Sequence, residues 1–468
     1  MEYADTAYLL ARYAARSKYR DLTESAIQSA KFMLKDTIAL MIGGSRGAIS
    51  RKLSGLYSGW GGKPESTVLV YGRRLPAHHA GFLNSVLIHE LDYDDTHDAG
   101  TMHVSPVAVP TCLAVGEMTG ASGKEVISAL VNTVELGVRL SLSIRKSISE
   151  TGWIYSAICQ YLSAAAVSAA LLGLDEEHIV MAMGTAYAQM GGTYQVSADA
   201  ADTKRMQPAL AVRDGIWSAM LAKEGISGCH RVIDGSFGWI NQYLRGEVEP
   251  ERLRNICEHV ARYEIENLSY KPYPSCRFTH SAIDAVKKMM REHGLSAEDV
   301  IDGRVEVSSL TFRSVCQPVE LKQHPQTYMQ AQYSIPFTLA VTLTHGDVTL
   351  ETLSEESLGD APVVSLAQRI TPVISPELDS RYGRTVAPSI VTLNTRRGIF
   401  TECVEQPLGA PENPFTDAMT ESKLVQCIKH SGLKVDREKL SSATKMIDEL
   451  EQLEDINIFV RSLQSAFE

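Results

Sequence analysis

The segment that most constrains this chain covers residues 89–106, HELDYDDTHDAGTMHVSP, which gathers many ionisable groups between two apolar runs. It holds five carboxylates, three histidines and two threonines. The apolar residues of 81–88 and 107–115 predict two mostly buried helices around it. Buried helices can hold such a polar, glycine-containing segment rigidly, so it is either a candidate site or a capped, solvated loop.

Apolar residues recur at helical spacing through most of residues 1–266, which predicts an all-helical domain. Ser122-Gly123-Lys124-Glu125 has the pattern of a capping box, and the helix after it is expected to run to about Leu142. A short alternating stretch at 66–72 predicts a strand or an extended segment. The other predicted helices cover 3–16, 24–42, 76–91, 105–118, 155–172, 176–190 and 208–224.

The pattern changes in residues 267–404, which predict a smaller α+β domain. Strands are expected at 303–307 and 389–395, and the second of these continues through the turn Arg396-Arg397-Gly398 into a hairpin partner at 399–404. Helices are expected at 279–293, 330–344 and 354–370. Residues 405–468 return to helical patterns. The fold class is therefore mainly α with an α+β second domain.

Composition and charge narrow the possible partners. The net charge is −11, from 45 basic and 56 acidic residues, which disfavours nucleic acid because phosphate binding needs a basic face. No apolar run is long enough to predict a membrane span, and residues 1–5 do not resemble a signal peptide. The eight cysteines are scattered, which predicts reduced thiols, no metal site and a cytoplasmic protein.

Two further stretches carry positive charge. Lys204 and Arg205 come directly before a predicted helix, where the positive end of the helix favours an anion over a cation. They form either an anion site or a solvated pair. Residues 268–280, with Lys271 and His280, contain two prolines that fix an extended backbone and so aim the side chains at little entropic cost.

Several segments, in the same order along the chain, resemble one known family. They are LDYDDT at 91–96 followed by His103, GLD at 173–175, TKR at 203–205, DG at 234–235 with FG at 237–238, KPYPSC at 271–276 with His280, QYSIPF at 332–337, and TRRG at 395–398 with PENP at 411–414. Together they resemble the MmgE/PrpD family, which includes 2-methylcitrate dehydratase, cis-aconitate decarboxylase and iminodisuccinate epimerase.

The resemblance implies a helical domain built from both chain ends, 1–266 and 405–468, and an inserted lid domain at 267–404. It also implies a homodimer, no metal or organic cofactor, and a site in the cleft between the domains that binds a small acid. His103 is the expected proton carrier, because an unperturbed histidine titrates near neutral pH. The other site positions implied are Asp92, Thr96, Lys204 and Lys271, and the neighbouring Arg205, Cys276 and His280 are expected to bind substrate.

Three positions depart from the family pattern. Many relatives have a histidine where this chain has Ile154, so Tyr155 is the candidate to replace a second acid/base group. Gln207 stands where many members have histidine, and Cys276 stands where some do. Gln207 is expected among the substrate-binding residues. Each change removes a titratable nitrogen, which weakens the dehydratase hypothesis.

Three functions follow from the residues and the resemblance. The first is a cofactor-independent lyase, either dehydratase or decarboxylase, that acts next to a carboxylate by general acid/base catalysis. The second is an epimerase or isomerase that uses the same carbanion. The third is an inactive relative that only binds acids.

Overall fold

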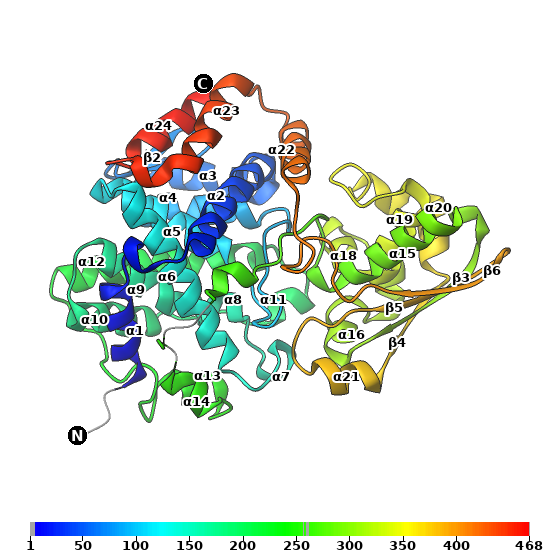
Figure 1. Cartoon of the computed structure of the whole chain (residues 1–468), viewed down its shortest axis with the longest axis horizontal. Coiled ribbons are helices and arrows are strands. Elements are labelled where there is room, and N and C mark those ends of the chain that lie inside the picture. The colour runs from blue at the N-terminus through cyan, green and yellow to red at the C-terminus, as the bar shows by residue number, and fades with distance from the viewer. Residues whose placement is uncertain (1–4, 256, 259–261, 468) are drawn as a thin grey trace.

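The computed structural model describes residues 5–255, 257–258 and 262–467. Within these residues the protein is mainly helical, with one two-stranded sheet and one four-stranded sheet. Two hydrophobic cores lie side by side, and we call the parts built on them the helical body, on the left in Figure 1, and the mixed region, on the right. None of the described helices is both long and apolar enough to cross a membrane.

The helical body follows the predicted helices closely. The helix expected over 3–16 begins at Thr6, and residues 3 and 4 lie outside the described part of the chain. The helix expected over 155–172 is interrupted at Cys159. The predicted extended stretch forms β1 (Ser66–Val68), which pairs with β2 (Arg73–Leu75) in antiparallel orientation. The helices are α1 (Thr6–Arg16), α2 (Glu24–Gly44), α3 (Ala48–Trp60), α4 (Ala77–His89), α5 (Ser105–Thr119), α6 (Gly123–Leu142), α7 (Ile148–Thr151), α8 (Tyr155–Ile158), α9 (Gln160–Leu171), α10 (Glu176–Tyr187), α11 (Gln195–Ala198), α12 (Gln207–Lys223), α13 (Trp239–Leu244) and α14 (Pro250–Arg254).

Caps and small residues explain how these helices begin and how closely they pack. The predicted capping box is present, since the Ser122 hydroxyl and the Glu125 carboxylate each accept a backbone N–H at the start of α6. Helices α9 and α12 approach so closely that a Cβ atom at Gly215 would lie 2.7 Å from the Ala164 Cβ. Only glycine fits there, so the middle of α12 packs directly on α9.

The mixed region is a four-stranded sheet with helices packed on it. The strand order is β4-β3-β5-β6, with β3 and β4 parallel and the other pairs antiparallel. The hairpin β5–β6 matches the prediction, but β4 was not predicted, and the helix expected over 354–370 is reduced to α20. The elements are α15 (His280–His293), β3 (Val300–Val307), α16 (Ser309–Val315), α17 (Val319–Gln323), α18 (Tyr328–Gln332), α19 (Ile335–His345), α20 (Ala361–Ala367), β4 (Ile370–Ile374), α21 (Pro376–Tyr382), β5 (Ile390–Thr395) and β6 (Gly398–Cys403).

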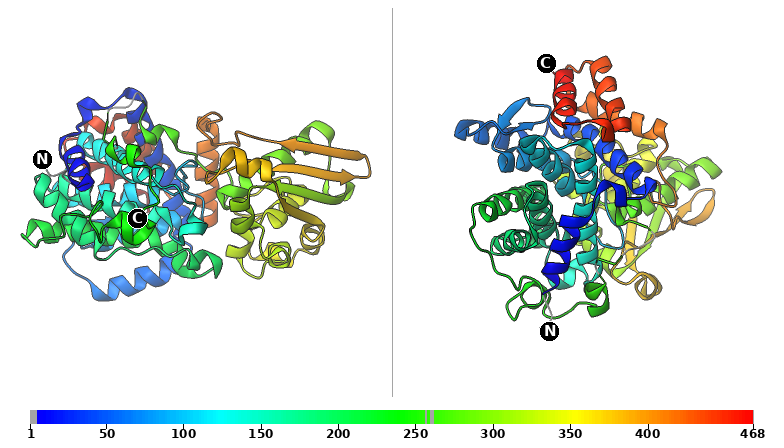
Figure 2. Two further views of the ribbon diagram at one scale, coloured as in Figure 1. Left: turned by 90° about the horizontal axis from the view of Figure 1, so that it is seen from below. Right: turned by 60° about the vertical axis from the view of Figure 1, so that its left-hand side comes forward.

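The end of the chain returns to the helical body. Helices α22 (Asp417–Ser431), α23 (Arg437–Met446) and α24 (Asn457–Gln464) follow the last strand. Figures 1 and 2 show α23 and α24 in red against the blue N-terminal helices, and α22 packs on α2. The first core accordingly includes residues from both ends of the chain, such as Leu34 and Phe459.

One buried ion pair joins α22 to the rest of the helical body. Lys423 Nζ lies 2.7 Å from Asp36 Oδ1 on α2, and both side chains are almost fully buried. The same ammonium group donates to the backbone oxygen of Tyr93 at 2.9 Å and lies 4.3 Å from the centre of the Tyr93 ring. The C-terminal part of the chain thus supports the polar segment at 89–106.

We expect Lys423→Met to lower the free energy of unfolding by about 3 kcal/mol, because it leaves the Asp36 carboxylate buried without its cation. Burial already raises the pKa of Asp36, and Lys423 opposes that shift. Urea unfolding followed by circular dichroism measures the change. Lys434→Met, at an exposed lysine after α22, is the control and should change stability by less than about 0.5 kcal/mol. Equal stability of the two variants would contradict the prediction.

Candidate active site

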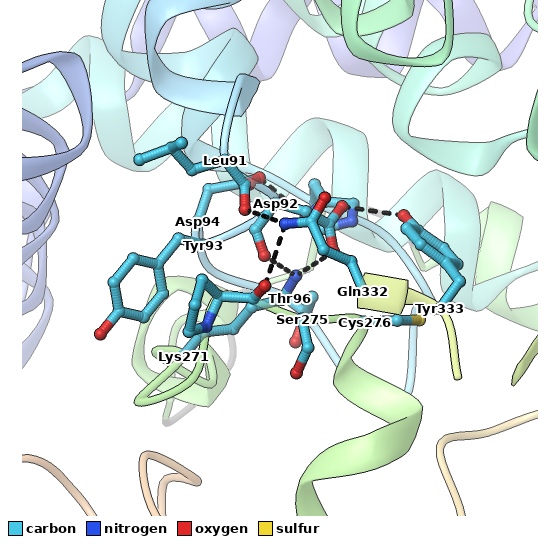
Figure 3. Close-up of polar contacts among 12 residues, drawn as sticks. Leu91, Asp92, Tyr93, Asp94, Thr96, Lys271, Ser275, Cys276, Gln332 and Tyr333 are labelled. Atoms are coloured by element: carbon cyan, nitrogen blue, oxygen red, sulfur yellow. Dashed lines mark hydrogen bonds and ion pairs between the residues drawn. The ribbon is translucent and has the colours of Figure 1, made fainter. Parts of the chain in front are cut away.

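Asp92 lies at the centre of the candidate site, three residues beyond the last residue of α4. Its backbone has a left-handed φ of 51°, which aspartate tolerates better than most residues with a side chain. Its buried carboxylate accepts hydrogen bonds from Lys271 Nζ at 2.9 Å, from the Tyr333 hydroxyl at 2.8 Å and from Lys204 Nζ. Figure 3 shows Lys271 and Tyr333 converging on Asp92. One carboxylate therefore joins residues from distant parts of the chain.

The charges around Asp92 do not cancel. Burial alone would raise the pKa of Asp92, but the ammonium groups of Lys204 and Lys271 outweigh it and hold this pKa well below its ordinary value. The carboxylate thus stays ionised. Because two lysines share one carboxylate, the cluster keeps an excess of positive charge in a site of low dielectric constant. Such a cluster is suited to binding an anion or stabilising a developing negative charge.

A second array joins two histidines to one carboxylate. Asp94 Oδ2 lies 2.7 Å from His103 Nδ1, and both Asp94 oxygens lie 3.0 Å from His89 Nδ1. The His103 Nδ1 atom is also 3.0 Å from the backbone oxygen of Asp95. Since these neighbours only accept hydrogen bonds, the Nδ1 atom of each histidine carries the proton. This leaves the Nε2 atom of each ring to act as the exchanging nitrogen.

The two histidines differ in what faces Nε2. His89 Nε2 lies 3.1 Å from Lys204 Nζ, which donates to it. Burial lowers the pKa of His89 to about 4, despite the nearby Asp94, so this ring is neutral near pH 7. No described residue forms a hydrogen bond with His103 Nε2, and His103 lines a cavity. Its Nε2 atom is therefore placed to exchange a proton with a bound molecule.

The backbone that carries these residues is tied down at several points. Asp95 Oδ1 accepts from the N–H groups of Val104 and Ser105 at 3.2 and 2.9 Å, which caps the start of α5 directly after His103. Burial raises the pKa of Asp95 to about 7. Thr96 pairs with Ser269 through two backbone hydrogen bonds, so the segment at 89–106 is joined to the extended stretch that carries Lys271.

The cavity next to these groups has a volume of about 290 Å³, near the lower end of the range for small-molecule sites. Of the residues selected from the sequence, Thr96, His103, Lys204 and Cys276 line it. Asp92 does not line the cavity but contacts Lys204, and Lys271 contacts Asp92. The Thr96 hydroxyl donates to Asp98 Oδ1 at 2.8 Å. The structure thus brings together six of the ten selected residues.

The other four do not line this cavity. The Tyr155 hydroxyl is turned away and donates to the backbone oxygen of Lys146 at 2.6 Å, so it does not take the place of a histidine at Ile154. Arg205 lies beside Glu90, in a different cleft. The last two point into the fold: Gln207 Nε2 donates to the backbone oxygen of Thr193, and His280 Nε2 lies 3.2 Å from the Ser275 oxygen.

Several residues at the site were not selected from the sequence. His89 and Asp94 lie in the first segment considered, but only the fold shows that both contact His103. Tyr333 lies in the QYSIPF segment of the resemblance, which could have identified it. Arg277 and Lys322 also line the cavity. Arg277 belongs to the basic stretch at 268–280, which could have identified it, whereas nothing in the sequence pattern around Lys322 indicated its place.

His89, Asp94 and His103 also have ligand atoms within 4.8 Å of one another, a spacing compatible with a metal ion. Both Nδ1 atoms donate to Asp94, and the His89 Nε2 atom faces the Lys204 ammonium group. Hydrogen bonding alone accounts for this spacing, and a cation next to His89 Nε2 is unfavourable for a metal there. We therefore assign no metal site to these three residues.

Comparison with known proteins places the chain in one protein family. Residues 9–251 match the MmgE/PrpD N-terminal domain, and residues 273–449 match the MmgE/PrpD C-terminal domain. The chain belongs to the MmgE/PrpD family, which confirms the resemblance found in the sequence.

Two of the similar proteins described next cover nearly the whole chain, and a third covers about half of it. A cis-aconitate decarboxylase-like protein of Aspergillus oryzae is 26% identical over 98% of this chain and 94% of its own length. The cis-aconitate decarboxylase of Homo sapiens is 24% identical over 96% of this chain and 92% of its own. A mitochondrial 2-methylcitrate dehydratase of Yarrowia lipolytica is 20% identical over 55% of this chain and 49% of its own.

We expect Asp92→Asn, which keeps the shape and the tolerance for left-handed φ, to lower the free energy of unfolding near pH 7 by about 3 kcal/mol, because it leaves two lysines without their anion. The pKa of Asp92 is depressed in the folded protein. Its stabilising contribution is therefore complete above the unfolded pKa of about 4 and is lost as the pH falls further.

Urea titrations of the wild type and Asp92→Asn from pH 3.5 to 8 measure this difference. The difference should be constant above about pH 5 and shrink below about pH 4. Asp436→Asn, at the cap of α23, is a control with no lysine partner among the described residues. A difference that grows towards low pH would show that Asp92 is not held ionised by the lysines.

Proposed function

We propose that this protein is a lyase that acts on a polycarboxylate, at a carbon next to a carboxylate, and that it releases carbon dioxide. One observation carries the proposal: the Nδ1 atom of His103 is fixed by Asp94, while its Nε2 atom has no described partner and the ring lines a cavity shared with Lys204. A proton carrier next to an ammonium group is what carbanion chemistry beside a carboxylate requires.

The residues suggest a sequence of events. Lys204 uses two of its three donors on Asp92 Oδ1 and His89 Nε2, so the third donor is available for a substrate carboxylate. When the carbon–carbon bond to a second carboxylate breaks, carbon dioxide leaves and its electron pair stays on the substrate carbon. Protonated His103 gives its Nε2 proton to that carbon. The neutral histidine then regains a proton from solvent.

Decarboxylation needs fewer acid/base groups than dehydration. Two histidines line the cavity, and both nitrogens of His97 are engaged: Nδ1 accepts from the Gly100 N–H at 2.9 Å, and Nε2 contacts Glu264 at 3.1 Å. Burial raises the pKa of Cys276 to about 11, so that thiol stays protonated. His103 is thus the one cavity histidine with a nitrogen that no described residue occupies, and a single proton carrier supports decarboxylation.

The names of the similar proteins also favour decarboxylation over dehydration. The proteins that match along nearly the whole chain are named cis-aconitate decarboxylase or decarboxylase-like, while the 2-methylcitrate dehydratase matches about half of it. An unsaturated tricarboxylate such as cis-aconitate is accordingly the first substrate to test. Dehydration of 2-methylcitrate is the second candidate, favoured by the same family.

Two other hypotheses use the same site. An epimerase or isomerase needs one proton carrier and a stabilised carbanion, which His103 and Lys204 could also supply. A protein that only binds acids would keep the cationic cluster and transfer no proton. The expectations of a homodimer and of catalysis without a cofactor rest on the family resemblance, and that of a cytoplasmic location rests on the scattered cysteines. All three belong to this proposal.

We expect wild-type protein to convert cis-aconitate in deuterated buffer containing EDTA, with loss of carbon dioxide and deuterium at one carbon of the product. His103→Ala should lower the rate by about 100-fold to 10,000-fold, the usual contribution of a general acid. Proton NMR and carbon dioxide release follow the reaction. The panel also includes 2-methylcitrate, citrate and iminodisuccinate.

The control is His324→Ala, at an exposed histidine of the mixed region that does not line the cavity; it should keep the wild-type rate. A new alkene from a hydroxy acid would establish the dehydratase instead. Deuterium exchange without change of mass or loss of carbon dioxide would establish the epimerase. The proposal would be overturned if the wild type converted none of the acids in the panel, or if His103→Ala kept full activity.

A further inference from the structure

Lys322 lies on α17, at the wall of the cavity that the mixed region provides. The residue is 8% exposed, so it is as buried as many core residues. None of the described residues forms a hydrogen bond or an ion pair with its ammonium group. The Nζ atom itself keeps some contact with solvent, so what the fold leaves it without is a counter-ion. A largely buried charge without one is costly, and a folded protein rarely keeps such a charge without a reason.

The other buried lysines show how unusual this is. Lys31 lies 2.7 Å from Glu451, and Lys423 lies 2.7 Å from Asp36. Lys204 and Lys271 share Asp92. Each of these four buried lysines thus has a carboxylate, whereas Lys322 has none among the described residues. Lys322 also lines the cavity that holds His103 and Lys204.

The groups nearest to Lys322 do not neutralise it. Burial lowers the pKa of Lys322, and the electrostatic effects that oppose this come from the thiols of Cys276 and Cys316. Burial raises the pKa of Cys276 to about 11 and that of Cys316 to about 12, so both thiols are neutral near pH 7. The described protein therefore supplies no anion for this ammonium group, and a bound ligand could supply it.

The position of Lys322 relative to the reacting groups indicates what that ligand is. His103 and Lys204 belong to the helical body, whereas Lys322 belongs to the mixed region and lines the same cavity. The Cys276 thiol interacts electrostatically with both Lys204 and Lys322. The two ammonium groups thus face one small cavity from different parts of the fold.

We propose that Lys322 binds a second carboxylate of the substrate, away from the carbon that reacts with His103, and so makes the site selective for di- and tricarboxylates over monocarboxylates. This inference rests on the proposed function for the identity of the reaction. The role of Lys322 in binding is nevertheless separate from catalysis. Lys322 is a specificity-determining residue, and its ammonium group donates hydrogen bonds to a carboxylate that would otherwise lack a partner.

The test uses a tricarboxylate that cannot react. Propane-1,2,3-tricarboxylate has neither a hydroxyl group to lose nor a double bond, and butyrate provides a monocarboxylate of similar chain length. Isothermal titration calorimetry measures the binding of each to the full-length wild type and to Lys322→Met. We expect Lys322→Met to weaken binding of the tricarboxylate by about tenfold to 100-fold, and to change butyrate binding by less than about threefold.

Two further variants and one stability measurement separate binding from structure. Lys322→Arg keeps the charge and should retain tricarboxylate affinity within about tenfold. Lys434→Met, at an exposed lysine that does not line the cavity, should bind like the wild type. Lys322→Met should unfold at the same temperature as the wild type or higher, because it removes a largely buried charge that has no counter-ion among the described residues. A purely structural lysine would instead lower the unfolding temperature.

Each outcome decides the inference. Equal binding of the tricarboxylate by the wild type and Lys322→Met overturns it, and so does a wild type that binds no carboxylate. Loss of affinity for both ligands in equal measure also overturns it, since selectivity would not reside in Lys322. Selective loss of tricarboxylate binding supports it. If that loss is found but the wild type converts no acid of the panel, the proposed reaction fails while the role of Lys322 stands.

Discussion

The sharing of one buried carboxylate by two lysines is the interaction on which the site depends. Asp92 comes from the end of α4, Lys204 precedes α12, and Lys271 lies in the extended stretch that leads into the mixed region. Each lysine would be costly to bury alone, and Asp92 lowers that cost for both. Because one anion serves two cations, positive charge is left over, and it faces the cavity where an anionic substrate would lie.

A second dependence links the site to the fold of the whole chain. The segment at 89–106 anchors Leu91, Tyr93, Met102 and Val104 in the first core, and contacts with distant parts of the chain hold its backbone between them. Lys423, from the C-terminal helices, donates to the backbone of Tyr93, and Ser269 pairs with Thr96. The return of the C-terminal residues to the helical body therefore stabilises the loop that carries His103 and Asp94.

The sequence predicted the helices well, because helical periodicity and caps are local properties. It did not predict β4, whose Pro372 is unusual in a strand and whose partner β3 is distant in the sequence. Residues in polar or family-like segments, such as Asp92 and Lys271, were recognised as site candidates. Tyr155 was chosen by its place in a motif, but the direction of its hydroxyl depends on how α8 packs.

The sequence by itself determined the family, the helical and mixed regions of the chain, and a set of acids, lysines and histidines suited to proton chemistry beside a carboxylate. Only the tertiary structure decided which of them meet. It paired Asp94 with His89 and His103, turned Gln207 and His280 into the fold, and brought Lys322 to the cavity without a carboxylate. Asp94 is close to both histidines in the chain, but the loop that carries them has no helical or strand period, so no local pattern indicates which side chains meet. Lys322 is distant in the chain from His103 and Lys204, and only the packing of the mixed region on the helical body brings it to their cavity.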